Sequence, residues 1–299
     1  MLFKSLKKLS NKDTSFSKKS RVFNCNGKVL DFESPKVMGI LNLSPESFYD
    51  GGFFDSKDKW ISRTQKMLDE GADIIDIGAA SSRPGAKLIS LEDEIERLLP
   101  ALKILRDNFP STIFSVDTFR SEVAKQSFDH GANIINDISG GNLDDKMFET
   151  IAKLDIPYIL MHMQGIPDSM QDNPIDNDII KNVKTFFTDK LRILNELGVK
   201  DVILDPGFGF GKTLNSNYHL LKFQEDIRIS DLPILSGLSR KSMINKVLNT
   251  TPEEALNGTS ILNLIAVQNG ANILRVHDVK EAKQLIQLWD YYETINPSS

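Results

Sequence analysis

The sequence predicts an α/β fold, a (β/α)8 TIM barrel, on three observations. Eight short runs of mostly β-branched residues follow one another from residue 37 onward. Between them lie segments with helical spacing of apolar side chains. Continuous apolar runs are typical of parallel strands covered on both faces, and eight βα units in about 260 residues match a closed barrel. The predicted strands are residues 37–41, 74–77, 112–116, 133–136, 158–161, 202–204, 233–235 and 272–276.

The helical pattern is clearest in residues 61–70, 91–105 and 179–197. Several predicted helices end at a glycine, which caps helix C-termini because it adopts left-handed backbone angles at little cost. These predicted caps are Gly71, Gly131, Gly198 and Gly270. Ahead of the first strand, residues 21–32 contain the turn pair Asn26-Gly27, which predicts a short β-hairpin. We expect this hairpin to plug the floor of the barrel.

Residues 1–20 carry six lysines and one acidic residue, and they are too polar to bury a face. We expect a flexible Lys-rich arm there, with a short membrane-touching helix as the alternative, and a single barrel domain over residues 21–299. The net charge of −5 leaves no global field to attract nucleic acid. No apolar run approaches the roughly 18 residues of a membrane span. With one cysteine and no apolar signal segment, the sequence indicates a cytoplasmic protein without nucleic-acid or membrane partners.

In a (β/α)8 barrel the active site lies at the C-terminal ends of the strands, so the residues that follow each predicted strand are the candidates. Turn formation alone would place small residues there, whereas the sequence places carboxylates, amides, histidines and cations. Their joint occurrence indicates one polar binding site at this rim. The candidates are Asn42, residues 78–83, Asp117, Asn136, Asp137, His162, Asp205, Ser239, Arg240, Lys241, Arg275 and His277.

Three of these residues suit a flat heterocycle. Asp117 and Asn136 follow neighbouring strands, and Asp205 ends a third strand. A carboxylate beside an amide can hold the N–H and NH2 edge of an aminopyrimidinone ring, and a second carboxylate can take another part of that edge. Capping of the following helices is the alternative role for Asp117 and Asn136.

A second group suits a diphosphate. Arg83, Arg275 and His277 follow strands remote in sequence, yet the last strand of a barrel lies beside the first. An arginine fork binds phosphate oxygens in bidentate fashion, so these residues predict a diphosphate site with Asn42 nearby. Asn42 is also the predicted ligand of a Mg²⁺ ion shared with the diphosphate, because Mg²⁺ takes few protein oxygens besides phosphate. An unpaired surface arginine is the alternative for Arg83.

The segment Asp205-Pro-Gly-Phe-Gly-Phe-Gly-Lys-Thr213 ends like a phosphate-binding loop, but the first glycine of that motif falls on Pro206. An NTPase is therefore disfavoured. We expect instead a loop that lets Phe208 and Phe210 reach a flat ligand. His162 lies between two methionines, which indicates a packed side chain rather than a catalytic one.

These motifs resemble, in this order, those of the dihydropteroate synthases of folate biosynthesis over residues 37–289. The matching strings occupy residues 38–52, 71–78, 82–86, 115–118, 134–138, 160–165, 204–213, 238–244 and 274–279. Among them are Ser115-Val-Asp-Thr118 and Leu274-Arg-Val-His-Asp-Val279. The resemblance implies a pterin-binding transferase that joins p-aminobenzoate to 6-hydroxymethyl-7,8-dihydropterin diphosphate. Its products would be 7,8-dihydropteroate and diphosphate, formed with Mg²⁺ by a dissociative displacement of diphosphate.

The resemblance also assigns roles to residues. The pterin pocket maps onto Asp117, Asn136, Asp205 and Lys241. The diphosphate site maps onto Asn42, Ser82, Arg83, Arg275 and His277, with Asn42 as the metal ligand. The p-aminobenzoate slot maps onto Phe48, Pro84, Phe210, Lys241 and Ser242. The implied catalytic residues are Asp117, Lys241, Arg275 and His277. A homodimer is implied through the last helices, where apolar surface is expected from Ile261, Leu262, Leu264 and Ile265.

Two alternatives share a pterin-holding barrel. A pterin-binding methyltransferase domain that serves a corrinoid partner would not need Arg275 with His277, or residues 239–241. A non-catalytic pterin-binding paralogue is the second alternative. Its support is Ala80, which stands where the family usually has glutamate, and the otherwise intact set of site residues argues against it.

Overall fold

The structure, a computed structural model, describes residues 21–43, 53–79, 88–165, 170, 172 and 174–295. The predicted arm of residues 1–20 lies outside this part of the chain. The same holds for residues 80–83, which include Ala80, Ser82 and Arg83, and for Phe48 and Pro84.

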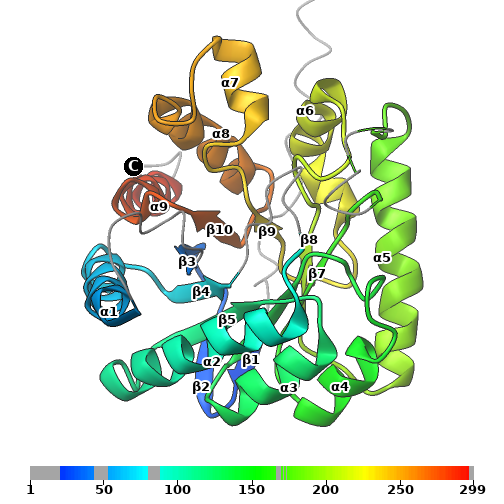
Figure 1. Cartoon of the computed structure of the whole chain (residues 1–299). Coiled ribbons are helices and arrows are strands. Elements are labelled where there is room, and N and C mark those ends of the chain that lie inside the picture. The colour runs from blue at the N-terminus through cyan, green and yellow to red at the C-terminus, as the bar shows by residue number, and fades with distance from the viewer. Residues whose placement is uncertain are drawn as a thin grey trace, which may run out of the picture.

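Eight parallel strands form the barrel (Figure 1). They are β3 (Lys36–Asn42), β4 (Ile74–Gly78), β5 (Ile113–Asp117), β6 (Ile134–Asp137), β7 (Tyr158–Met161), β8 (Val202–Asp205), β9 (Leu235–Ser236) and β10 (Ile273–Val276). Neighbouring strands follow the order β8-β7-β6-β5-β4-β3-β10-β9. The ring closes between β8 and β9, where Leu204 forms a parallel bridge with Ile234 and donates its N–H to the carbonyl of Pro233 at 2.8 Å.

Helices cover the outside of this barrel (Figure 1). They are α1 (Phe53–Asp69), α2 (Leu91–Asn108), α3 (Ser121–Asp129), α4 (Met147–Leu154), α5 (Ile179–Glu196), α6 (Leu214–Lys222), the 3-10 helix η2 (Gln224–Ile227), α7 (Ser242–Leu248), α8 (Leu256–Gln268) and α9 (Val279–Glu293). Within the described residues, no helix combines the length and the apolar composition needed to cross a membrane.

The predicted strands agree with the observed ones to within two residues at each end. The largest difference is at β9, because Pro233 has no N–H to donate and regular pairing begins only at Leu235. The predicted helix 61–70 is the second half of α1, which begins at Phe53. The four predicted glycine caps are confirmed, since all have φ between 86° and 97°.

The predicted hairpin and its position are also confirmed. Strands β1 (Val22–Cys25) and β2 (Lys28–Asp31) are joined by Asn26 and Gly27, whose φ angles of 52° and 82° are those of a type I′ turn. The buried hairpin side chains pack against one apolar residue from each barrel strand, which makes an apolar floor. These strand residues are Met38, Ile74, Ile113, Ile134, Ile159, Ile203, Leu235 and Ile273.

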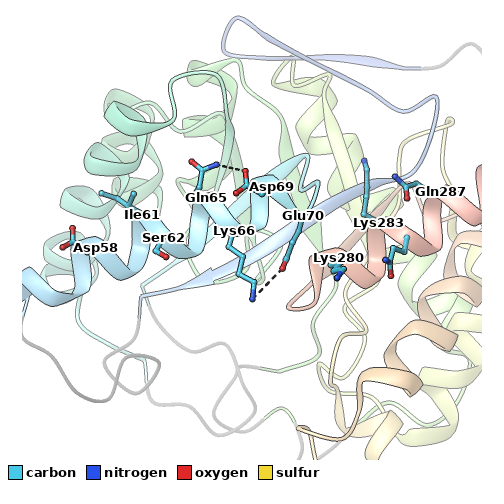
Figure 2. A pocket seen from close by; sticks show the side chains of 11 residues that line it. Asp58, Ile61, Ser62, Gln65, Lys66, Asp69, Glu70, Lys280, Lys283 and Gln287 are labelled. Atoms are coloured by element: carbon cyan, nitrogen blue, oxygen red, sulfur yellow. Dashed lines mark hydrogen bonds and ion pairs between the residues drawn. The ribbon is translucent and has the colours of Figure 1, made fainter.

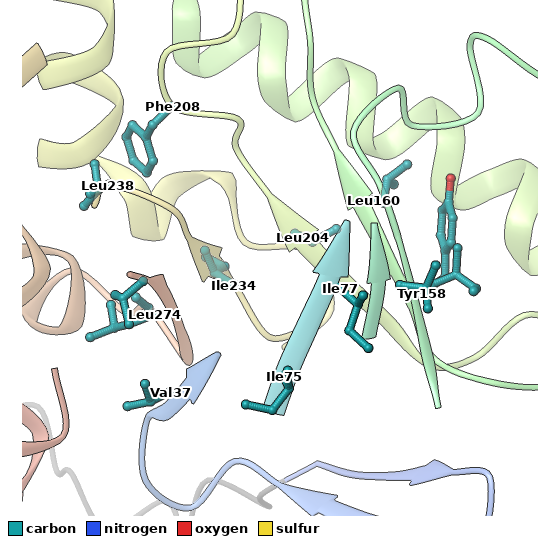
Figure 3. Close-up of a cluster of buried hydrophobic side chains, with 14 of the residues drawn as sticks. Val37, Ile75, Ile77, Tyr158, Leu160, Leu204, Phe208, Ile234, Leu238 and Leu274 are labelled. Carbon is teal, nitrogen blue, oxygen red and sulfur yellow. The ribbon is translucent and has the colours of Figure 1, made fainter. Parts of the chain in front are cut away.

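Alternate strand residues point outward, into the core between the barrel and its helices (Figure 3). Val37, Ile75 and Leu204 belong to this outer core. Phe208 belongs to it too and is fully buried (Figure 3). The expectation that Phe208 reaches a ligand at the mouth is therefore wrong, because apolar neighbours in the outer core enclose its side chain.

Inside the barrel, one layer of polar residues lies directly above the apolar floor. Because side chains alternate along a strand, the residue two positions after a floor residue also points inward. Five such positions carry polar side chains, and four of the five are almost fully buried. These five residues, here called the polar layer, are Asp76, Ser115, Asn136, Asp205 and Arg275.

Helix α8 presents only part of the apolar surface that the sequence predicts. Ile261 and Leu264 are exposed, with 52% and 37% of their surface accessible. Leu262 is buried at 7%, and Ile265 packs partly against the core. The expectation that Leu262 supplies surface for a partner is wrong, because its position on α8 turns it toward the core.

Candidate active site

Arg275 binds two carboxylates at once. Its Nε donates to Oδ2 of Asp76 at 2.7 Å, and its Nη2 donates to Oδ2 of Asp117 at 2.9 Å. Burial disfavours the charged guanidinium, but the attraction of Asp76, Asp117 and Asp205 outweighs burial and raises the Arg275 pKa. Arg275 is therefore a permanent cation inside the barrel.

Asp117 ends β5, two residues beyond the polar layer toward the mouth. Burial raises the pKa of Asp117 to about 7, and the charge of Arg275 opposes this rise. Repulsion from Asp76 adds to it. At neutral pH the Asp117 carboxyl group is consequently poised between its neutral and charged forms. A ligand that donates hydrogen bonds to it favours the charged form.

Asn136 lies beside Asp76 in the polar layer, and its Nδ2 donates to Oδ2 of Asp76 at 3.1 Å. The Asn136 Oδ1 remains an acceptor, with no hydrogen-bond partner among the described residues. In the same part of the chain, Oδ1 of Asp76 and Oγ of Ser115 are also buried without a partner. Asp76 and Ser115 are paired in register on neighbouring strands. Buried polar atoms are rarely left unpaired, so this cluster indicates a ligand that carries donors.

Asp205 and Lys241 form the opposite side of the site. Asp205 ends β8, and its Oδ1 accepts the N–H of Gly207 at 2.7 Å. Burial raises the Asp205 pKa, and Lys241 opposes this effect. Burial lowers the pKa of Lys241 to about 8, and Asp205 in turn opposes that shift. The Lys241 Nζ donates to the carbonyl of Phe208 and lies 4.9 Å from the centroid of the Phe210 ring.

Lys212 holds the loop that carries Phe210. Its buried Nζ donates to the carbonyls of His162, Gly207 and Phe210 at 3.2, 2.7 and 3.0 Å. Burial lowers the Lys212 pKa to about 7. With its donors used on backbone carbonyls, Lys212 stabilises the loop and does not bind a phosphate, in agreement with the incomplete phosphate-loop motif.

His277 follows β10 at the mouth and is oriented by Ser239. The Ser239 Oγ accepts the backbone N–H of His277 at 3.2 Å and lies 3.0 Å from His277 Nδ1. The Ser239 hydroxyl group and the imidazole Nδ1 share one hydrogen bond, which orients the ring and leaves Nε2 as the second ring nitrogen. Asn42 ends β3, the strand that pairs with β10, so Asn42 and His277 leave adjacent strands.

Three candidates at the strand ends stabilise the fold instead. Asp137 accepts the hydroxyl of Tyr158 at 2.6 Å and belongs to a buried network outside the polar layer. Arg240 forms an ion pair with Asp278 at 2.8 Å. His162 is buried, and burial lowers its pKa to about 2, so the prediction of a packed histidine is confirmed.

Sequence reasoning missed Asp76, because this residue lies in the middle of β4 and not at its end. A signal was present, since Asp76 is a single carboxylate within a strand that is otherwise apolar and fully buried. A buried carboxylate requires a cation or hydrogen-bond donors. Arg275 and Asn136 supply them here.

A surface groove of about 820 Å³ lies between α1 and α9, on the outside of the barrel (Figure 2). Its lining is polar and mixed in charge, and Lys66 and Glu70 within it pair at 3.7 Å. No candidate site residue is among the described residues that line this groove. The candidate active site is therefore the strand-end site and not this groove.

The family model for pterin binding enzymes matches residues 38–277. Dihydropteroate synthase of Escherichia coli (strain K12) is 41% identical over 264 residues, which cover 88% of this chain and 93% of that protein. This chain belongs to the dihydropteroate synthase family. The resemblance inferred from the sequence motifs is thereby confirmed.

Solved structures of dihydropteroate synthases share the fold of this chain. The Yersinia pestis enzyme in a sulfonamide drug complex has a TM-score of 0.86 and 38% identity, covering 92% of this chain and 100% of that chain. The Xanthomonas albilineans enzyme in complex with 7,8-dihydropteroate has a TM-score of 0.83 and 30% identity, with coverage of 92% and 100%. The predicted (β/α)8 barrel is confirmed.

In this member of the dihydropteroate synthase family, hydrogen bonds and close charges bring together most of the predicted pterin and catalytic residues. This group consists of Asp117, Asn136, Asp205, Lys241 and Arg275. Ser242 is exposed at the first position of α7, one residue after Lys241. The remaining candidates, Phe48, Ser82, Arg83 and Pro84, lie outside the described residues.

Proposed function

We propose that this chain condenses p-aminobenzoate with 6-hydroxymethyl-7,8-dihydropterin diphosphate, giving 7,8-dihydropteroate and diphosphate in folate biosynthesis. The observation that carries the proposal is a set of acceptors near the cation of Arg275, formed by the buried Asn136 and Asp205 and the largely buried Asp117. In a dihydropteroate synthase family member, this set fits a flat ring with an N–H edge joined to an anionic leaving group.

Pterin recognition follows from the acceptors. The 2-amino-4-oxo ring presents N–H and NH2 donors on one edge. Asp117 and Asp205 accept such donors as carboxylates, and Asn136 accepts through its Oδ1. The Lys241 ammonium group lies close enough to Asp205 to interact with its charge, and it is a donor for the ring carbonyl.

Departure of diphosphate is the demanding step. The bond between the methylene carbon and the diphosphate oxygen breaks, and its electron pair stays on the diphosphate. Arg275 and His277 stabilise this growing negative charge. Nε and Nη2 of Arg275 donate to carboxylates, whereas Nη1 has no hydrogen-bond partner among the described residues and is available to the diphosphate. The electron-rich ring shares the positive charge of the methylene, and the Asp117 carboxylate favours that cation.

The nucleophile needs little activation. An aryl amine is neutral at pH 7, so its lone pair forms the new C–N bond without a strong base, and the ammonium proton then leaves to water or diphosphate. Phe210, Lys241 and Ser242 are the described residues proposed to line the p-aminobenzoate slot. The buried Phe210 ring supplies a flat apolar wall, and the Lys241 ammonium group above it suits a carboxylate.

Mg²⁺ fits this site as a companion of the diphosphate. Among the described residues, no three His, Cys, Asp or Glu side chains come together as a metal site. The Asn42 side-chain oxygen would hold the ion together with diphosphate oxygens, because Mg²⁺ takes few protein oxygens besides phosphate. When bound, Mg²⁺ supplies charge neutralisation for the diphosphate.

We also propose a homodimer and a cytoplasmic location. Exposed Ile261 and Leu264 on α8 and exposed Leu288 and Tyr291 on α9 support an apolar interface on the last two helices. The single cysteine, Cys25, is buried in the hairpin, and burial raises its pKa to about 12, so it is an unreactive thiol.

The experiment that tests the function is a two-substrate assay, with and without Mg²⁺. The proposal predicts equal amounts of 7,8-dihydropteroate and diphosphate, only when both substrates are present. Pterin binding without any product would favour a non-catalytic paralogue. Methyl transfer to a corrinoid acceptor without diphosphate release would favour a methyltransferase domain.

A further inference from the structure

Asp76 holds two residues of the proposed active site, Arg275 and Asn136, with one oxygen atom. This carboxylate is fully buried in β4, and its Oδ2 accepts Nε of Arg275 at 2.7 Å and Nδ2 of Asn136 at 3.1 Å. The proposed reaction uses Arg275 and Asn136 directly but gives no role to Asp76.

The chemistry of Asp76 decides how Asn136 faces a ligand. The Asp76 Oδ2 is an acceptor, because both Nε of Arg275 and Nδ2 of Asn136 donate to it. Asn136 must therefore turn its NH2 end toward Asp76 and its carbonyl end away. The Asn136 Oδ1 is buried and without a partner among the described residues, which agrees with an acceptor reserved for a ligand.

We propose that Asp76 is a positioning residue that makes Asn136 an obligate acceptor, and so selects rings with an N–H donor on the edge that faces Asn136. With Asp117 and Asp205, the pocket then presents three acceptors to the ring. The inference rests on the proposed function, because it takes a pterin as the ligand. It adds a specificity-determining residue that acts on the substrate by fixing the orientation of Asn136.

The test is a double-mutant cycle on the pair, with 6-hydroxymethyl-7,8-dihydropterin as the calorimetric probe. Asp76→Asn lets residue 76 donate, so Asn136 is free to present its NH2 end to the ring. Asn136→Asp places a second carboxylate beside that of Asp76, and the two repel each other. Each single change is expected to weaken binding about tenfold or more, the value of one charge-assisted hydrogen bond.

The double variant Asp76→Asn with Asn136→Asp exchanges the two side chains and keeps total charge and size. Its residue 76 donates to a carboxylate at position 136, which again shows only acceptors to the ligand. We expect the double variant to recover binding to within about threefold of the unmodified protein. Recovery distinguishes positioning from simple loss of packing, which would make the two changes add.

Asp137→Asn serves as the matched control. Asp137 is the neighbouring buried carboxylate, and it binds Tyr158 instead of Asn136. This variant is expected to lower the unfolding temperature and leave pterin affinity within twofold, or about 0.4 kcal/mol. In steady-state kinetics, Asp76→Asn should raise KM for the pterin diphosphate and leave KM for p-aminobenzoate within about twofold.

The outcomes separate this inference from the proposed function. If the unmodified protein neither binds the pterin nor forms 7,8-dihydropteroate, the proposed function fails and the inference with it. If the unmodified protein does both, but Asp76→Asn binds normally or the folded double variant shows no recovery, the role of Asp76 alone is overturned. Recovery in the double variant supports it even where a single variant fails to fold.

Discussion

The Lys241 ammonium group lies 4.9 Å from the centroid of the Phe210 ring, in cation–π geometry. Lys241 caps the N-terminus of α7, whereas Phe210 belongs to the loop between β8 and α6, so the contact joins two loops at the barrel mouth. Asp205 interacts with the same ammonium group. One cation thus connects a carboxylate of the pterin pocket to the proposed p-aminobenzoate slot.

The activity should have a narrow pH optimum. Asp117, with its pKa raised to about 7, accepts ring donors well only above that pH. Lys241, with its pKa lowered to about 8, keeps its charge only below that pH. We expect kcat/KM for the pterin diphosphate to fall on the acidic side as Asp117 gains a proton and on the alkaline side as Lys241 loses one. A pH–rate profile measures both limbs.

Two variants test which residue causes the fall in activity on each side of this pH profile. Asp117→Asn has no carboxyl group to titrate, so its lower activity should not decline further on the acidic side. Lys241→Arg stays charged at high pH and should lose the alkaline limb. Profiles that keep both limbs in both variants would show that other groups control the rate.

Arg275→Ala should destabilise the fold as well as the site. The change leaves the fully buried Asp76 and the largely buried Asp117 without their shared cation. Removing one partner of a buried ion pair costs about 3 kcal/mol, so urea denaturation should show a loss of that order. Pterin binding should weaken together with diphosphate binding, because Arg275 contacts Asp117.

Arg240→Ala is the matched control for that change. Its bidentate ion pair with Asp278 is partly exposed, whereas Asp76 is fully enclosed, so we expect a smaller loss of unfolding free energy than for Arg275→Ala. Equal losses of unfolding free energy in the two variants would contradict the assignment of Arg275 to a buried charge network.

Gly207→Ala should disrupt the conformation of the loop between β8 and α6. A Cβ at Gly207 would lie 2.0 Å from the carbonyl oxygen of His162, a backbone atom that cannot move aside, and the φ of 66° adds strain. Gly198 has a φ of 86° at the end of α5, but a Cβ there meets nothing within 4 Å. We expect Gly198→Ala to cost about 1 kcal/mol and Gly207→Ala several times more, by thermal denaturation. Similar costs would mean that the loop relaxes freely.

Ser239→Ala should lower kcat more than it changes affinity. Without the hydroxyl group, His277 loses the hydrogen bond on Nδ1 that orients its imidazole ring. Loss of such an orienting partner typically costs about tenfold or more in activity. Calorimetry with 6-hydroxymethyl-7,8-dihydropterin, which lacks the diphosphate, should give unchanged binding. A matching loss of pterin affinity would place Ser239 in the pterin pocket instead.

Local patterns predicted the barrel well, because each strand is a short buried run and several helices end at a glycine. Gly71 and Gly198 indicated the ends of their helices, because a helix cap requires left-handed backbone angles that glycine adopts readily. The strand-end rule also located Asp117 and Arg275, since parallel strands end on one rim. The largest departure is at β9, because Pro233 interrupts its pairing.

Contacts between side chains from distant segments of the chain could not be predicted from local sequence patterns. Asp76 lies inside a strand, and its importance appears only when Arg275, 199 residues away, is seen on the same oxygen. Phe208 and Phe210 are two residues apart in one glycine-rich loop, yet Phe208 belongs to the outer core and Phe210 to the cluster at the mouth. The turn of that loop depends on Lys212, whose three carbonyl partners come from two different segments.

The most direct test of the polar layer as the pterin site is a crystal structure of this protein with 7,8-dihydropteroate bound. We expect the N–H edge of the pterin within about 2.7–3.2 Å of oxygens of Asp117, Asn136 and Asp205, and the aminobenzoyl ring toward Phe210. A pterin ring bound in the groove between α1 and α9, or above the mouth without these contacts, would contradict this expectation.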